Sequence, residues 1–326
     1  MPSFAIGVDL GGTNLRIAAV DESGKVLEKV TAGTEGGRGR DAVLDEMCRA
    51  IQQAAGKHAA AGKLAGIGVG VPGIIDMGTG MLRQSPNLPG WEDYPVRQEI
   101  EQRLGARVIL ENDANCAALG EKWLGAAQDV DDMLMLTLGT GVGGGLVLGG
   151  RIWHGARGMA GEPGHINVLR DGHPCGCGSH GCLEQYASAT AVVRLAREAV
   201  ASGKAPGLAQ ADAAGKLTAR AVFELAQQGD RPAQEVYKIA GRALGVVLAG
   251  LINLLNLPVY VVGGGVADAW EAFAPAMMDE VGKRSFVYRA TAPDSKAPGR
   301  KTVVTRALLG SDAGLVGAAR LPMLSG

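Results

Sequence analysis

The sequence predicts an α/β protein built from two related lobes, with a metal-binding loop in the second. Three observations lead to this fold class. Strand and helix patterns alternate in the first third of the chain, and the pattern begins again at Met133. Glycine-rich turns join strands at corresponding places in both segments, and three of the five cysteines cluster in the second. At 326 residues, the chain is long enough for about two domains with their own cores.

The first segment is expected to fold as β-β-β-α-β-α-β-α. Apolar runs bounded by turn residues predict strands, and apolar residues at helical spacing predict helices. In chain order we expect strands over 4–9, 15–21 and 26–31, a helix over 42–61, a strand over 64–71, a helix over 96–104, a strand over 107–110 and a helix opening at 111–114.

The second segment starts with an apolar strand over 133–138 that runs into glycines at 139–145. Residues 146–148 form another apolar run, and Gly149-Gly150 turns it, so a hairpin is expected. Further on, residues 243–267 carry no charge, which raises the alternative of a membrane span. Asparagines, a proline and helical spacing favour a buried helix followed by a core strand over 259–262.

Composition describes an ordinary soluble protein. Charged residues make up 20% of the chain, the net charge is −1 and hydrophobic residues reach 47%. Bulk electrostatics therefore imply neither nucleic acid nor an anionic membrane as a partner. The N-terminus lacks the basic start and apolar core of a signal peptide, so a cytoplasmic protein is expected.

Three glycine runs follow predicted strands and are candidates for binding phosphate. They lie at 11–14, 139–145 and 263–265. Exposed backbone N–H groups in such turns form anion-binding concavities, and the hydroxyls of Thr13 and Thr140 add donors. Positions 139, 141 and 144 also match the dinucleotide fingerprint of oxidoreductases. That fingerprint needs a helix straight after the glycines, whereas a strand is expected here.

The loop around Cys175, Cys177 and Cys182 has the density of thiols and glycines expected of a zinc site. A disulfide is disfavoured, since three thiols leave one over. The residues leave the fourth ligand open among three histidines, His165, His173 and His180. The other two cysteines, Cys48 and Cys116, fall in predicted helices, where cysteine behaves as a small apolar residue.

Two aspartates have the setting of functional carboxylates. Asp9 ends the first strand beside the first glycine run and is suited to hold Mg²⁺ through water. Asp113 lies in the first turn of a predicted helix, where the helix dipole favours the ionised form that accepts a proton. An ordinary helix cap is the alternative for Asp113.

With these segments placed, the chain resembles the ROK family (repressor, open reading frame, kinase), and within it the sugar kinases of the glucokinase type. The resemblance covers essentially the whole chain and implies the two-lobed actin-like, or ribonuclease H-like, sugar kinase fold with a zinc-binding loop. It implies a small lobe of residues 1–117, to which a helix over 311–326 returns, and a large lobe of residues 118–310. The motifs that carry it are 9–14, 111–115, 138–145, 162–165 and 175–184.

The same resemblance implies a role for each motif residue. Asp113 would be the catalytic base. The sugar would be bound by Asn87, Asn112, Asp113, Glu162, His165 and Glu184. A structural zinc ion would be held by His165, Cys175, Cys177 and Cys182. ATP with Mg²⁺ would be bound by Asp9, Gly11, Gly12, Thr13, Asn14, Gly139, Thr140, Gly141, Val142, Gly143, Gly144, Gly263, Gly264 and Gly265.

The implied activity is transfer of the γ-phosphoryl group of ATP to the 6-hydroxyl of glucose, the entry step of glycolysis. N-acetylmannosamine, N-acetylglucosamine or fructose is the alternative substrate. A sugar-responsive transcriptional regulator is a further alternative, which the predicted first strand at Phe4 disfavours because such regulators begin with a helix-turn-helix domain. A homo-oligomer, dimer or tetramer, is expected, with no nucleic acid and no membrane as partner.

Overall fold

The computed structural model describes residues 3–34, 39–60, 62–85 and 88–324. Its contacts group the chain into two compact units. The first unit contains Met1–Asp131, Gly145–Gly161 and Ser311–Gly326, and the second contains Asp132–Gly144 and Glu162–Gly310. The family resemblance implied a first lobe that ends near residue 117; by contacts, residues 118–131 and Gly145–Gly161 also group with the first unit.

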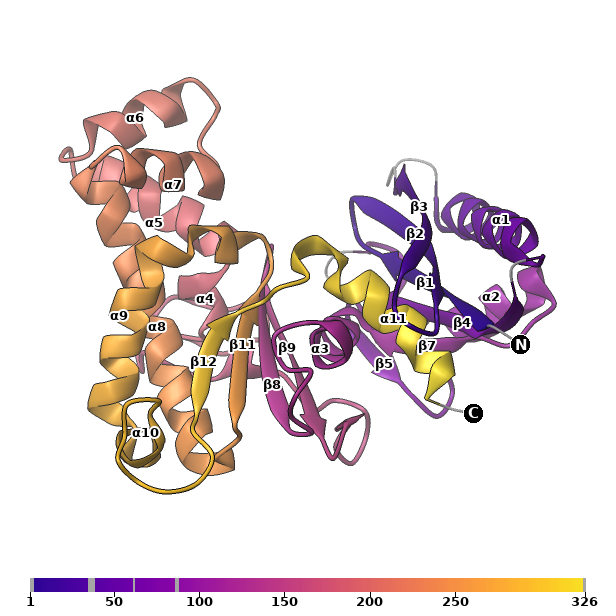
Figure 1. Ribbon diagram of the computed structural model, residues 1–326. Coiled ribbons are helices and arrows are strands. Elements are labelled where there is room, and N and C mark those ends of the chain that lie inside the picture. Colours follow the sequence, from indigo (N-terminus) through magenta and orange to yellow (C-terminus); the bar gives the residue numbers. More distant parts are fainter. Residues whose placement is uncertain (1–2, 35–38, 61, 86–87, 325–326) are drawn as a thin grey trace. The chain divides into compact units, whose positions relative to one another are not determined.

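The first unit is organised around a five-stranded sheet with the order β3-β2-β1-β4-β7 (Figure 1). Its strands are β1 (Ser3–Leu10), β2 (Asn14–Asp21), β3 (Val26–Gly33), β4 (Lys63–Val71) and β7 (Ile109–Asn112). The first three strands form an antiparallel meander, and β4 and β7 join β1 in parallel. The sheet thus mixes hairpins with helical crossovers, as the expected element order requires.

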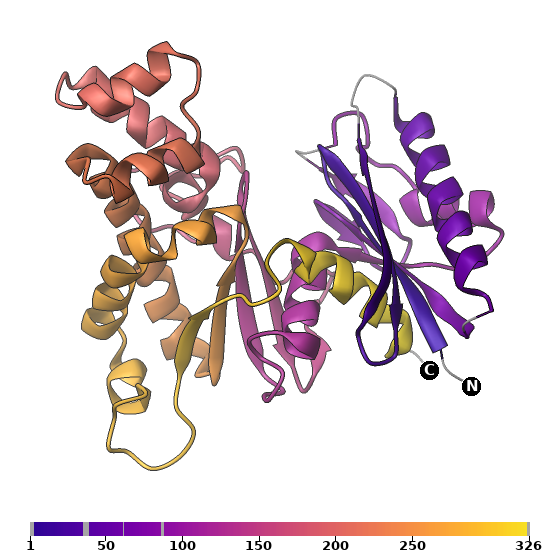
Figure 2. The ribbon, with the colours of Figure 1, turned by 45° about the horizontal axis from the view of Figure 1, so that its top comes forward.

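Helices cover both faces of this sheet (Figure 2). On one face, α1 (Arg40–His58) and α2 (Val96–Leu104) pack onto alternate β1 residues such as Ile6 and Val8. On the other, α3 (Asp113–Leu124) and α11 (Ala313–Met323) pack against each other and the sheet. The remaining strands of the first unit are β5 (Ile74–Asp76), β6 (Met81–Gln84) and β10 (Arg151–Ile152).

The C-terminal helix α11 lies unusually close to the sheet because glycines face it. A Cβ at Gly68 of β4 would lie 1.9 Å from the carbonyl oxygen of Ala318, and one at Gly7 of β1 would lie 2.3 Å from that of Leu315. Gly317 of α11 meets α3 in the same way, with the Cys116 carbonyl oxygen 1.7 Å from an added Cβ. Side chains other than hydrogen are therefore excluded at these contacts.

A second sheet has the order β10-β9-β8-β11-β12, and the second unit supplies β8, β11, β12 and the first residues of β9. It contains β8 (Met133–Leu138), β9 (Val142–Leu148), β11 (Val259–Gly263) and β12 (Val303–Arg306). Strands β8, β11 and β12 are parallel, and β9 passes from the second unit into the first at Gly144. The helices of the second unit are η1 (Pro163–His165), α4 (Glu184–Ala187), α5 (Ala189–Ala201), α6 (Pro206–Ala213), α7 (Ala219–Gln227), α8 (Arg231–Leu255), η2 (Gly265–Ala269), α9 (Trp270–Arg284) and α10 (Phe286–Thr291); η3 (Gly310–Asp312) crosses the unit boundary.

Helix α8 is long and apolar enough, by length and composition, to pass as a membrane span. It packs along α9 and against α5 and α7, and half of its most apolar window is buried inside the protein (Figure 1). It begins at Arg231, after the capping Asp230 and with Pro232 in its first turn, and it is ended by Asn256 in a left-handed conformation. These are the features of a core helix, as the sequence indicated.

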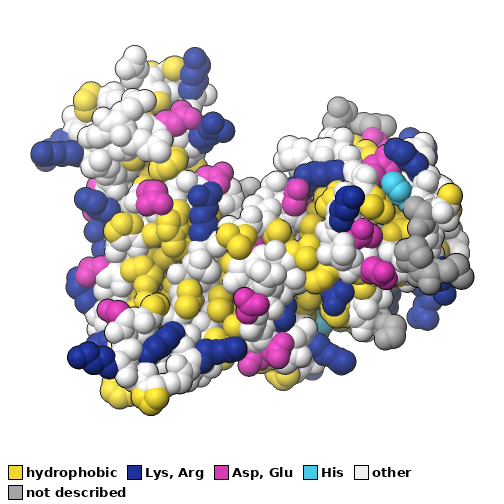
Figure 3. All heavy atoms as spheres, viewed as in Figure 1, with side chains coloured by type: hydrophobic (Ala, Val, Ile, Leu, Met, Phe, Trp, Pro, Cys, Tyr) yellow, Lys and Arg dark blue, Asp and Glu magenta, His cyan; other side chains and the backbone are white. Residues whose placement is uncertain are grey.

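Basic and acidic side chains are interspersed over the visible face of each unit (Figure 3). This mixing agrees with the net charge of −1.

Some expected boundaries are displaced. The helix expected over 42–61 is α1, Arg40–His58, and the strand expected over 107–110 is β7, Ile109–Asn112. The strand continues because Glu111 and Asn112 still pair with Gly70 and Val71 of β4. The helix starts only at Asp113, where the Asn112 side chain caps it.

Candidate functional site

In the first unit, carboxylates gather at the carboxyl ends of parallel strands. Asp9 of β1, Gly70 of β4 and Glu111 of β7 lie in one row across the sheet. Gly70 leaves room on this row for α3, since a Cβ there would lie 3.1 Å from the Cys116 sulfur. Ligands of α/β sheets bind outside the carboxyl ends of the strands, so this edge is the candidate site of the unit.

Asp113 takes the first position of α3, directly after this row. The Asn112 carboxamide oxygen accepts hydrogen bonds from the N–H groups of Ala114, at 2.9 Å, and Asn115, at 3.2 Å. The Asn112 amide donates to the Gly73 carbonyl oxygen at 3.1 Å, which ties the cap to the end of β4. Asp113 Oδ1 accepts from the Ala114 N–H at 2.9 Å. The helix dipole favours the ionised form of a carboxylate at this position.

Asp9 contacts the guanidinium of Arg16, its partner residue on β2. Burial raises the pKa of Asp9, and the charge and hydrogen bond of Arg16 oppose that rise. Arg16 also donates to the Ser311 carbonyl oxygen beside the start of α11. The first glycine turn follows Asp9 and is closed by a hydrogen bond from the Gly11 N–H to the Asn14 carbonyl oxygen at 2.8 Å.

In the second unit, the second and third glycine runs lie together. The hairpin between β8 and β9 is closed by the Gly139 N–H, which donates to the Gly141 carbonyl oxygen at 2.9 Å. Gly264, at φ +86°, packs on the end of β8, where a Cβ would lie 2.5 Å from the Leu138 carbonyl oxygen. Because strand β9 follows the hairpin glycines, the dinucleotide-fingerprint alternative is excluded.

Three polar side chains adjoin this hairpin. Glu184, the first residue of α4, accepts a hydrogen bond from the Val142 N–H at 3.0 Å. Gly164 presses the turn that carries Glu162 and His165 against β9, since a Cβ would lie 2.0 Å from the Val142 carbonyl oxygen. Burial raises the pKa of Glu162; the His165 charge lowers it and the Glu184 charge raises it. The three groups therefore share one electrostatic environment.

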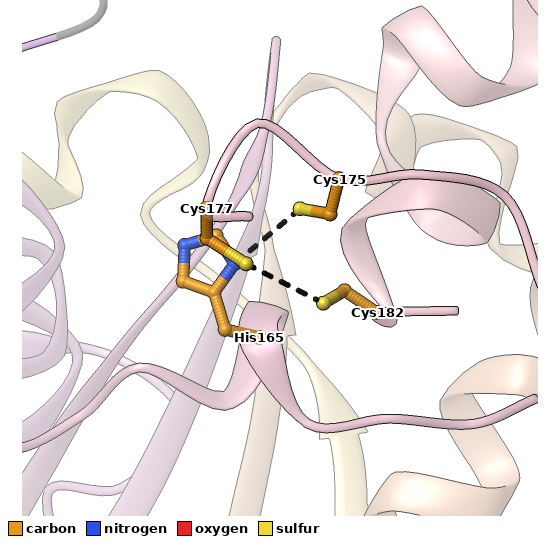
Figure 4. Close-up of side chains that lie close together, drawn as sticks. All are labelled: His165, Cys175, Cys177 and Cys182. Atoms are coloured by element: carbon orange, nitrogen blue, oxygen red, sulfur yellow. Dashed lines mark hydrogen bonds between the residues drawn. The ribbon is translucent and has the colours of Figure 1, made fainter. Parts of the chain in front are cut away.

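Next to them, a histidine and three cysteines form a cluster suited to a metal ion (Figure 4). His165 extends from η1, and Cys175, Cys177 and Cys182 come from the loop that precedes α4. One ligand atom from each lies within 4.8 Å of all the others. Of the histidines considered for the fourth position, His173 and His180 are not members of this cluster.

The distances in the cluster match tetrahedral zinc. His165 Nδ1 is 3.7 Å from Cys175 Sγ, and the sulfurs of Cys177 and Cys182 are also 3.7 Å apart. Zn–S bonds of about 2.3 Å and Zn–N bonds of about 2.0 Å at tetrahedral angles place ligand atoms about 3.5 to 3.8 Å apart. A hydrogen bond from the Ser179 backbone lowers the pKa of Cys177, whereas burial raises that of Cys182 to about 12.

The other site residues expected from the sequence can now be assigned to the two units, with one exception. Asn87 lies outside the described residues. The rest fall into two sets by unit, with Asp9, residues 11–14, Asn112 and Asp113 in the first and residues 139–144, 162, 165, 184 and 263–265 in the second. Cys48 and Cys116 are buried in α1 and α3, as expected.

The sequence reasoning missed two polar pairs of the first unit, Arg16 with Asp9 and His154 with Glu111. The first pair could have been predicted from the sequence. Asp9 and Arg16 lie at similar distances from the turn of a predicted hairpin, so they are expected to face each other on the two strands. The second pair could not have been predicted, since His154 reaches Glu111 only through the tertiary fold.

Comparison with known proteins bears directly on this site. A description of the ROK family matches residues 5–323. A glucokinase of Halalkalibacterium halodurans is 40% identical over 315 residues, which cover 96% of this chain and 92% of that protein. A xylose repressor of Caldicellulosiruptor bescii is 30% identical over 283 residues, or 86% of this chain and 71% of the repressor. A glucokinase of Streptomyces griseus, solved with glucose and AMPPNP, superposes with a TM-score of 0.77, at 36% identity and 98% coverage of both chains.

Proposed function

Because the chain belongs to the ROK family, we propose that it transfers the γ-phosphoryl group of ATP to the 6-hydroxyl of glucose. The observation that carries this proposal is the similarity, over 98% of both chains, to a glucokinase that holds glucose and AMPPNP. Kinship to a glucokinase at 40% identity supports it further. The repressor relative is less similar, and this chain spans a smaller share of it.

Asp113 is the catalytic base in this proposal. Its place at the first position of α3 favours the carboxylate, which takes the proton from the attacking hydroxyl as the bond to phosphorus forms. Asn112 fixes the first turn of the helix by accepting from two backbone N–H groups. A base held by a capped helix keeps its orientation, and phosphoryl transfer depends chiefly on such positioning.

The sugar hydroxyls are bound by Asn87, Asn112, Asp113, Glu162, His165 and Glu184. Carboxylates accept hydrogen bonds from hydroxyls, and a site that pairs each hydroxyl rejects sugars lacking one. Glu184 is oriented by the Val142 N–H, and Glu162 lies in the same electrostatic environment. The raised pKa of Glu162 makes it a strong acceptor once a hydroxyl reaches it.

ATP is bound by the backbone of the glycine runs at 11–14, 139–144 and 263–265. Their N–H groups suit the phosphates, and Gly139 and Gly265 have open space at the Cβ position, so a ligand can approach the backbone closely. Mg²⁺ is held through Asp9, whose carboxylate oxygens are the ligand type it prefers, and when bound it neutralises phosphate charge. Arg16 holds the Asp9 carboxylate in place.

Zinc is the ion that suits the cluster of His165, Cys175, Cys177 and Cys182. With four protein ligands it is structural, because no position is left for a reacting water. His165 faces Cys175 through Nδ1, so Nε2 is the atom available to a sugar hydroxyl. We assign the two units to the two lobes of the kinase, and we propose a cytoplasmic homo-oligomer as its working form.

A panel of hexoses against several phosphoryl donors tests the function. Purified protein with Mg²⁺ is expected to phosphorylate glucose with ATP faster than N-acetylmannosamine, N-acetylglucosamine or fructose, measured by release of ADP. Faster turnover of another hexose would replace glucose as the substrate. Sugar-dependent binding to DNA without any phosphorylation would replace the kinase with a regulator.

A further inference from the structure

The carboxylate of Glu111 is buried, and none of the proposed contacts with sugar or ATP uses it. Only 2% of Glu111 is exposed to solvent. Burying a charge in this way is costly unless hydrogen bonds and an opposite charge compensate for it. The partners of Glu111 therefore indicate why the charge is there.

One oxygen of Glu111 holds the start of helix α3. Oε1 accepts a hydrogen bond from the Asn112 backbone N–H and another from the Asn115 side-chain amide, both at 2.9 Å. Asn112 and Asn115 flank Asp113 on either side, and Asn112 also caps the helix. Through these two bonds, Glu111 fixes the peptide that leads into Asp113 and the first helical turn beyond it.

The other oxygen faces a histidine from a distant part of the sequence. Oε2 lies 2.6 Å from Nε2 of His154, which follows strand β10 within the first unit. This hydrogen bond raises the pKa of His154, and burial opposes the rise only in part. Among the described residues, Glu111 is the charged neighbour that raises the pKa of His154. When His154 is protonated, it places a positive charge beside the buried carboxylate.

Asp9, in the same row of the sheet as Glu111, is paired with its own cation, Arg16. The carboxylates of Glu111, Asp9 and Asp113 all act on the buried thiol of Cys116. Burial and all three carboxylates raise the pKa of that thiol well above its usual value, so it stays uncharged. The acidic surroundings increase the need for His154 as a partner of Glu111.

We propose that Glu111 and His154 form a positioning pair that holds Asp113 in its catalytic orientation. The inference rests on the proposed function, since it needs Asp113 to act as the base. Neither member of the pair contacts the reacting atoms. Glu111 sets the peptide before Asp113, and the hydrogen bond with His154 orients the Glu111 carboxylate. Loss of the pair should therefore lower kcat more than it raises the KM for glucose.

Four variants test the pair by steady-state kinetics with glucose and ATP. Glu111→Ala leaves the Asn112 N–H and the Asn115 amide without their acceptor, and we expect kcat to fall about 10-fold to 100-fold, with a smaller change in KM. Glu111→Gln keeps an oxygen for these donors and should restore most of kcat. His154→Gln still donates to Glu111 but carries no charge. His58→Gln is the matched control. His58 Nε2 lies 3.1 Å from Glu28 Oε2 in a similar pair that does not involve α3, so the kcat of this variant should equal that of the wild type.

The pH profile separates a positioning role from a structural one. In the wild type, kcat should decline as the pH rises through the raised pKa of His154, and His154→Gln should lack that decline. Stability should follow the same sign. The pair stabilises the fold fully below the pKa of an unfolded histidine, about 6.5, and loses this contribution as the pH rises through the folded value.

The outcomes distinguish this inference from the function on which it rests. Wild-type protein that phosphorylates no sugar would overturn the proposed function and this inference with it. Active wild type together with folded Glu111→Ala of unchanged kcat would overturn the pair alone. Should Glu111→Ala fail to fold, His154→Ala takes its place, since that side chain is 35% exposed; unchanged kcat and pH profile in His154→Ala would then refute the proposal.

Discussion

Replacing Gly141 with alanine should displace the Glu184 carboxylate and weaken glucose binding. A Cβ at Gly141 would lie 2.3 Å from Glu184 Oε2, the oxygen that accepts from the Val142 N–H. Ordinary contact begins near 3.4 Å, so the carboxylate must retreat by about 1 Å. The backbone itself tolerates alanine, because φ at Gly141 does not lie in the left-handed region.

The magnitude follows from the hydrogen bond that the shift removes. A hydrogen bond to a charged group contributes about 1.5 to 3 kcal/mol, and a factor of ten corresponds to about 1.4 kcal/mol. If Glu184 loses one such bond to a sugar hydroxyl, the KM for glucose should rise roughly 10-fold to 100-fold. Initial rates over a range of glucose at saturating ATP measure this change.

Gly139→Ala is the matched control for this experiment. It lies in the same hairpin, and a Cβ there meets no atom within 4 Å. Its KM for glucose should match that of the wild type, whatever happens to its KM for ATP. An unchanged KM for glucose in folded Gly141→Ala would refute the placement of Glu184 in the sugar site.

Three further predictions concern the base, the metal and the core. Asp113→Asn should bind glucose in calorimetry yet lose about 10² to 10⁴ in kcat, and wild-type turnover would remove Asp113 from the mechanism. Cys177→Ser should lose zinc in elemental mass spectrometry while Cys48→Ala retains it; equal metal content would contradict the assignment of the cluster. Gly68→Ala should lower the free energy of unfolding in urea by about 3 kcal/mol through its 1.9 Å overlap with α11, whereas Gly56→Ala, in open space on α1, should raise it by about 0.5 to 1 kcal/mol.

Local signals made several elements predictable from sequence. Helix α2 begins and ends where the sequence indicated, because Pro95 precedes it and Gly105 ends it in a left-handed conformation. The hairpin after β8 was readable because an apolar run and a second turn follow its glycines. The cysteine loop was readable because the ligands lie close together in the sequence.

Other features depend on contacts that the sequence does not display. Strand β12 has four residues and none of them is buried, so no apolar pattern marks it, and only its pairing with β11 makes it a strand. Helix α6 has little apolar pattern, since Leu208 alone among its residues is buried. The exact end of β7 is set by pairing with β4, and the partner of Glu111 is 43 residues away in the sequence.

Because α11 covers one face of the first unit's sheet, that face cannot be buried until α11 has been synthesised. The sheet face that carries Ala5, Ala18 and Val20 is covered by Leu315 and Ala319. During translation this face stays open to water until α11 leaves the ribosome, although strands β1 and β2 are made much earlier. The first unit, which holds Asp113, therefore cannot complete its folding until α11 is made, and the nascent chain must keep an apolar sheet face from aggregating until then.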